Sequence, residues 1–87
     1  MQTIQELGAA IAQRRRSLGL KQGHVAATAG LAQAALSRFE RGKLPEFGSR
    51  KLLLVLAALG LELQFAEIVA TGSLDELRKE RGGDVKL

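Results

Sequence analysis

Apolar residues recur along most of the chain at the three-to-four-residue spacing that places one face of a helix on a core. The spacing predicts a first helix over residues 3–18, two short helices within residues 22–41, and a further helix over residues 49–59. Thr3 and Glu6 form a capping box, in which each side chain can satisfy a backbone N–H of the other residue. The buried stripe of the first helix is predicted to be Ile4, Leu7, Ile11 and Leu18.

The two short helices are joined at Gly30, where a sharp turn requires a left-handed residue that only glycine adopts at low cost. Ala26 is small enough for the two backbones to approach each other closely. The second short helix turns Leu36 and Phe39 inward. This is the pattern of a helix-turn-helix motif, whose second helix lies in the major groove of DNA.

The next segment predicts a homodimer. Leu52–Leu59 is apolar nearly all the way round, so a helix there must be covered on several sides. Leu61–Phe65 alternates with the period of a half-buried strand, and this chain offers that strand no neighbour. Pairing with a second subunit would resolve both problems. The predicted dimer interface consists of Val55, Leu59, Leu61, Leu63 and Phe65.

The predicted fold is therefore all-α: a compact bundle of four to five helices with a short C-terminal strand that pairs across a dimer. Residues 1–65 form the DNA-binding and dimerisation domain, and residues 66–87 form a tail. Ser73 and Glu76 give the tail a second helix-start signal. Its few apolar residues leave two alternatives, a frayed end or a segment that orders on a partner.

Composition excludes several classes of protein. Cysteine is absent, so neither a disulfide framework nor a thiolate metal site can form. The longest apolar run is half the length that a membrane span needs, and the N-terminus lacks the order of a signal peptide. We therefore expect a soluble cytoplasmic protein with no membrane partner.

Positive charge coincides with the motif. Residues 1–51 carry nine Lys or Arg and three Glu, whereas residues 52–87 carry four basic and six acidic side chains. A basic block over the motif is the expected footprint of phosphate binding.

Arg15 is predicted to pair with Glu40. At about 100° per residue Arg15 falls on the core side of its helix, and a buried guanidinium needs a carboxylate partner. Glu40 falls on the inward side of its own helix. The alternative is that the Arg15 side chain extends to solvent.

Four residues lie on the outward face of the second motif helix and are the candidates for base contact: Gln33, Ala34, Ser37 and Arg38. Gln and Arg have bidentate geometry for adenine and guanine edges. In isolation, each would be an ordinary solvated residue.

Phosphate contacts are expected further along the chain. Arg41 and Lys43 flank the loop after this helix. Ser49 is the expected N-cap of the last helix, and Arg50 and Lys51 occupy its first turn, where the helix dipole disfavours cations. Cations in that place suggest an external anion.

An enzyme is not expected. The single histidine, His24, lies on the exposed side of a helix without a second ligand or a nucleophile near it. We predict no catalytic residues, no metal and no cofactor. RNA binding by stacking needs exposed aromatic side chains, and the three Phe are assigned to the core and the strand.

Residues 7–65 resemble the Xre family of bacterial and phage repressors. The matching phrases are LGAAIAQRRRSLGL, the helix over residues 22–30, GLAQAALSRFERGK with Pro45 shortly after, and LAALGLEL. The last phrase is most similar to antitoxins of the HipB type. Such antitoxins pair a C-terminal strand across their dimer, bind a HipA-type Ser/Thr kinase toxin and repress their own operon.

The resemblance implies DNA contacts at residues that match the family motif: Gln22, Gln33, Ala34, Ser37, Arg38, Lys43 and Arg50. It also implies a palindromic operator and a toxin partner, for which Leu74, Leu77 and Leu87 are the apolar contacts expected in the tail. The sequence departs from the family at Lys21 and Ala32, where the usual Ser or Thr N-cap is missing at a cost of roughly 1 kcal/mol each. Two alternatives stay open: a stand-alone repressor without a toxin, and an antitoxin with little affinity for DNA.

Overall fold

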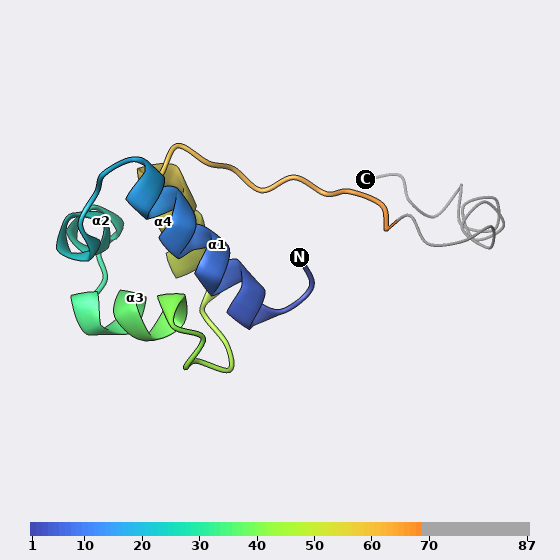
Figure 1. The fold of residues 1–87 in the computed structure, drawn as a ribbon, viewed down its shortest axis with the longest axis horizontal. Helices are drawn as coiled ribbons and strands as arrows, with labels where there is room; N and C mark the ends of the chain where they lie inside the picture. The colour runs from blue at the N-terminus through green and yellow to red at the C-terminus, as the bar shows by residue number, and fades with distance from the viewer. Residues whose placement is uncertain (69–87) are drawn as a thin grey trace, which may run out of the picture.

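Four helices make up the computed structural model, which describes residues 1–68 (Figure 1). They are α1 (Ile4–Ser17), α2 (Gln22–Ala29), α3 (Gln33–Glu40) and α4 (Ser49–Ala58). The all-α class expected from the sequence is confirmed, and no strand is present in the described residues.

The helices enclose one apolar core. α2 packs against both α3 and α4, and α1 packs against α3. Each helix contributes residues from one face, as the spacing predicted. The core residues are Ile11, Val25, Ala26, Ala29, Leu36, Phe39, Val55, Leu56 and Leu59. Phe47, in the loop before α4, stacks on Phe39 with ring centroids 4.0 Å apart.

The N-terminus of α1 is capped much as its sequence predicted. The Glu6 backbone N–H donates to Oγ1 of Thr3 at 3.0 Å. The Glu6 carboxylate accepts from the backbone N–H of Gln2 at 3.3 Å, one residue before the expected partner. Leu18, expected in the buried stripe, is 43% exposed because α1 ends at Ser17 and the chain turns at Gly19.

Gly8 brings α1 and α3 together. A Cβ atom built at Gly8 would lie only 2.1 Å from the backbone oxygen of Phe39, so no larger residue fits between the two backbones. Arg14, two turns further along α1, reaches the other side of the bundle. Its Nε donates to the Leu59 carbonyl at 3.1 Å, which satisfies an acceptor at the C-terminus of α4.

Two expectations about α4 are wrong. Gly48, not Ser49, is the N-cap, and it makes no side-chain cap bond. Val55 and Leu59 are not at a dimer interface, because they are 0% and 1% exposed in the core of a single chain. The exposed leucines of α4 are instead Leu53 and Leu54.

Residues 61–68 leave α4 as an extended segment without regular secondary structure (Figure 1). The strand expected at Leu61–Phe65 is thus not formed within one chain, since an isolated strand has no neighbour to complete a hydrogen-bonded ladder. Leu74, Leu77 and Leu87, expected to contact a toxin, lie outside the described residues.

Candidate nucleic-acid interface

The turn between α2 and α3 fixes how α3 is presented. Gly30 adopts φ 73° and ends α2. The Leu31 N–H donates to the Ala26 carbonyl at 2.8 Å and the Gly30 N–H to the Ala27 carbonyl at 3.2 Å, the pattern of a Schellman motif. Leu31 also packs against the core. The direction of the chain entering α3 is therefore set by backbone bonds and by an apolar anchor.

α3 has one buried face and one polar face. Leu36 and Phe39 are 0% and 1% exposed, and they hold the helix on the core. Of the four residues expected to contact bases, Gln33, Ala34 and Arg38 are exposed, and Ser37 is half-buried. At about 100° per residue, these four positions span roughly 140° around the helix axis, with Gln33 at the edge nearest the core.

Gln33 also leans toward the first turn of α2. A Cβ atom built at Gly23 would lie 3.3 Å from Oε1 of Gln33. The two residues line a shallow recess of about 730 Å³ together with Lys21 and Gln22. The recess places side-chain amides from two helices beside the uncapped start of α2.

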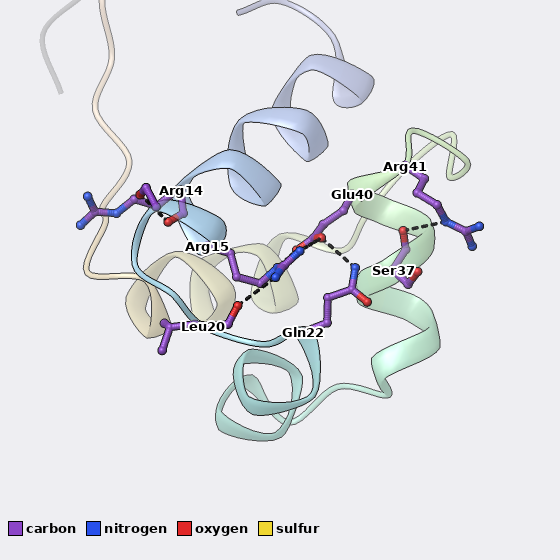
Figure 2. Close-up of polar contacts among 8 residues, drawn as sticks. Arg14, Arg15, Leu20, Gln22, Ser37, Glu40 and Arg41 are labelled. Atoms are coloured by element: carbon purple, nitrogen blue, oxygen red, sulfur yellow. Dashed lines mark hydrogen bonds and ion pairs between the residues drawn. The ribbon is translucent and has the colours of Figure 1, made fainter.

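A buried polar cluster locks α1, α2 and α3 together (Figure 2). Arg15 makes a bidentate pair with Glu40: its Nε donates to Oε2 at 2.8 Å and its Nη2 to Oε1 at 2.9 Å. Both residues are buried, and this is the pairing that the helix faces predicted. Arg15 Nη1 donates in addition to the Leu20 carbonyl at 2.9 Å. Every polar side-chain atom buried in the described residues has a hydrogen-bond partner.

Gln22 is the third member of this cluster, which the sequence did not reveal. Its Nε2 donates to Oε1 of Glu40 at 2.8 Å. Burial alone would raise the pKa of Glu40, but the hydrogen bonds from Arg15 and Gln22, with the charge of Arg15, outweigh burial and hold that pKa below its ordinary value. The hydrogen bond to Glu40 raises the pKa of Arg15. Gln22, expected to contact phosphate, thus also anchors the start of α2 to α3.

The basic residues expected to contact phosphate are all exposed: Arg41, Lys43, Arg50 and Lys51. Arg41 Nε donates weakly to the Ser37 carbonyl at 3.3 Å, which holds its guanidinium beside α3 (Figure 2). Arg50 and Lys51 stand in the first turn of α4, as expected.

Three helix N-termini lack a side-chain cap. Lys21, Ala32 and Gly48 precede α2, α3 and α4 without offering an oxygen to the free N–H groups. The first turns of these three helices also contain no acidic residue. Each terminus therefore keeps free N–H donors and the positive end of its helix dipole, which together favour an anion such as phosphate.

A protein-family model described as "Helix-turn-helix domain" matches residues 1–66. The chain belongs to this helix-turn-helix family. The match covers all four helices and the polar face of α3. Membership implies DNA binding. No curated protein matches the chain.

Among residues 1–68, no group of three or more His, Asp or Glu side chains lies close enough to hold a metal ion. In the same part of the chain, no helix combines the length and apolar character that a membrane crossing requires. The family is typically without catalytic activity.

Proposed function

We propose that this protein is a sequence-specific transcriptional repressor that reads double-stranded DNA with α3. The observation that carries the proposal is the outward face of α3, where Gln33 and Arg38 are exposed on a helix fixed from behind by the Arg15–Glu40 pair. Rigid placement matters, because bidentate contacts to base edges tolerate little displacement.

Base reading and phosphate binding are assigned to different residues. Arg38, near the middle of the outward face, reads a base edge, whereas Lys43, beyond Gly42, contacts the backbone. A base contact changes sequence preference, but a phosphate contact weakens all sequences alike and lowers the dependence on salt.

The test begins by selecting a preferred site from a random duplex pool with the purified protein. Arg38→Ala should lower affinity for that site by about 1–3 kcal/mol and relax preference at one base position. Lys43→Ala, the matched control, should weaken selected and random DNA equally and reduce the salt slope by about one. Equal losses on both DNAs for Arg38→Ala would make Arg38 a phosphate contact and refute the assignment of base reading.

The repressor acts as a homodimer on a palindromic operator in this proposal. Exposed apolar side chains at the C-terminal end of the described chain support the dimer. A two-fold dimer presents two copies of α3, which requires two half-sites about one turn of DNA apart.

An antitoxin role is the second candidate, and it rests on the resemblance of LAALGLEL and the following residues to HipB-type antitoxins. In that role the protein binds a HipA-like kinase toxin and represses the shared operon. The test is co-purification with a kinase-like protein encoded beside this chain. A neighbourhood without such a gene leaves the stand-alone repressor as the supported function.

A further inference from the structure

Gly23 stands in the first turn of α2, where the backbone does not require a glycine. Its φ is not positive, unlike that of Gly30 at the other end of the helix. Glycine inside a helix is destabilising relative to alanine, because it loses more backbone freedom on folding. A neighbouring group that needs the space beside Gly23 would explain why this residue has no side chain.

That space is taken by Gln33, the first residue of α3. A Cβ atom built at Gly23 would lie 3.3 Å from Oε1 and 3.8 Å from Cδ of Gln33. A separation of 3.3 Å is tighter than ordinary van der Waals contact, so a methyl group here would push the amide away. The Gln33 amide therefore lies against the start of α2 because residue 23 has no side chain.

The amide of Gln33 also has a direction. Its oxygen faces Gly23, whereas its nitrogen is not among the atoms within 4 Å of the same position. On this side α2 begins with no side-chain cap and no acid in its first turn, and Lys21 lines the same recess. The positive end of the helix dipole and the charge of Lys21 both favour the amide oxygen over the amide N–H groups. This orientation leaves the NH2 group of Gln33 for a ligand.

We propose that Gly23 is a positioning residue for base recognition, because the space it leaves holds the Gln33 amide oxygen toward α2 and makes Gln33 a hydrogen-bond donor to DNA. This inference rests on the proposed reading of DNA by α3. A bidentate contact to adenine needs the amide oxygen as well, to accept from the adenine amino group. Guanine instead offers two acceptors, N7 and O6, in the major groove. Gln33 therefore favours guanine over adenine at the base that it contacts.

The base preference is measured on the duplex selected with the full-length protein. Gln33→Ala identifies the position that Gln33 reads, because preference should relax there and not elsewhere. With guanine at that position, the wild type should bind roughly ten-fold more tightly than with adenine, the order of discrimination that one good base contact gives. Equal binding of the two duplexes, or tighter binding of adenine, would overturn the proposal.

Filling the space beside Gly23 tests the role of that residue. Gly23→Leu places a flexible side chain where the amide lies and should reduce the guanine preference to about two-fold or less. Gly23→Ala adds one methyl group, which the amide can accommodate by moving a few tenths of an ångström, so its effect should be smaller. Gly23→Ala should also raise the thermal unfolding midpoint by roughly 2–8 °C, because alanine is the better helix former. A changed base preference in a more stable variant would not come from loss of folding.

A double variant separates an effect through Gln33 from direct contact between the new side chain and DNA. In a Gln33→Ala background, Gly23→Leu should leave the base preference unchanged, because the amide on which it acts is absent. Ala27→Leu is the matched control, at an exposed position one turn further along α2. It should leave the guanine preference of the wild type intact.

Two results with these variants would overturn the role of Gly23. They are an unchanged guanine preference in Gly23→Leu, and a loss of equal size with and without the Gln33 side chain. The proposed function fails in a different way. If Gln33→Ala and Arg38→Ala both leave every base preference intact, the reading of DNA by α3 is wrong, and this inference falls with it. If only the Arg38 variant alters preference, the reading stands and the role of Gly23 alone is overturned.

Discussion

Glu40 is the residue on which the arrangement of the first three helices depends most. It accepts from Arg15 on α1 and from Gln22 on α2, and it belongs to α3 itself. Losing this carboxylate would leave a buried guanidinium without its partner, at a cost of about 3–5 kcal/mol. A domain of this size has a free energy of unfolding of about 5–15 kcal/mol, so losing this one carboxylate would remove a large part of it.

The pKa of Glu40 gives a pH-dependent prediction. Folding lowers this pKa below the ordinary value of 4.5, so the native state binds the proton less readily than the unfolded chain. The stability from the carboxylate is therefore fully present above the ordinary pKa and is lost as the pH falls through the lower folded value. We expect the free energy of unfolding, measured by urea titration, to be flat from pH 7 to 5 and to fall at lower pH.

Substitution identifies the source of that fall. Glu40→Gln should lower the free energy of unfolding at pH 7 by about 3–5 kcal/mol. The double variant Arg15→Met with Glu40→Leu should recover most of the loss, because apolar residues of similar volume often replace a buried ion pair without cost. The double variant should also lack the part of the acid dependence due to Glu40. Glu46→Gln, at an exposed acid, is the control, and an equal effect there would contradict the assignment to Glu40.

At the scale of the elements, the helices and their inward faces follow from the spacing of apolar residues. The Arg15–Glu40 pair follows too, because helical angles place both side chains inside and a buried charge needs a partner. The sequence did not predict correctly which residues of α4 face the core and which face away from it. A helix that is apolar on every side carries no stripe to show which residues face its own chain, so Val55 and Leu59 were misassigned.

Other features depend on contacts between distant segments. Gly8 is needed because the backbone of α3 lies against it, and nothing in the residues around Gly8 reveals that approach. The bond from Gln22 to Glu40 joins residues 18 positions apart. Arg14 and the Leu59 carbonyl are 45 positions apart. Sequence periodicity reports which face is buried, but it does not report which atoms meet across the bundle.

The uncapped start of α3 gives a prediction at this scale. Ala32 offers no oxygen to the first turn, so Ala32→Ser should add a cap and stabilise the domain by about 1 kcal/mol. Ala32→Asp should stabilise it similarly, but it would place a carboxylate where we expect a DNA phosphate. The thermal unfolding midpoint should therefore rise for both variants. Fluorescence anisotropy with the selected duplex should show lower DNA affinity for the Asp variant alone. Equal DNA affinity of the Ser and Asp variants would place the phosphate elsewhere.

For the whole molecule, the net positive charge and the helix-turn-helix domain both lie within residues 1–68. Among residues 1–68 the last core residue is Leu59, and the family match ends at residue 66. Residues 69–87 contain four basic and four acidic side chains, so they add nothing to the net charge of +4. The long-range attraction to DNA is thus a property of residues 1–68 alone.

Removing residues 69–87 should consequently leave DNA binding intact. A fragment of residues 1–68 should match the full chain in thermal unfolding midpoint and in the slope of DNA affinity against salt, because its core and its net charge are unchanged. Circular dichroism and anisotropy at several salt concentrations measure the two quantities. A lower midpoint for the fragment would show that the removed residues stabilise the domain.

If the antitoxin proposal is correct, the same fragment should bind a HipA-like kinase more weakly than the full chain does. Undiminished kinase binding would move the toxin contacts from Leu74, Leu77 and Leu87 to the helical domain.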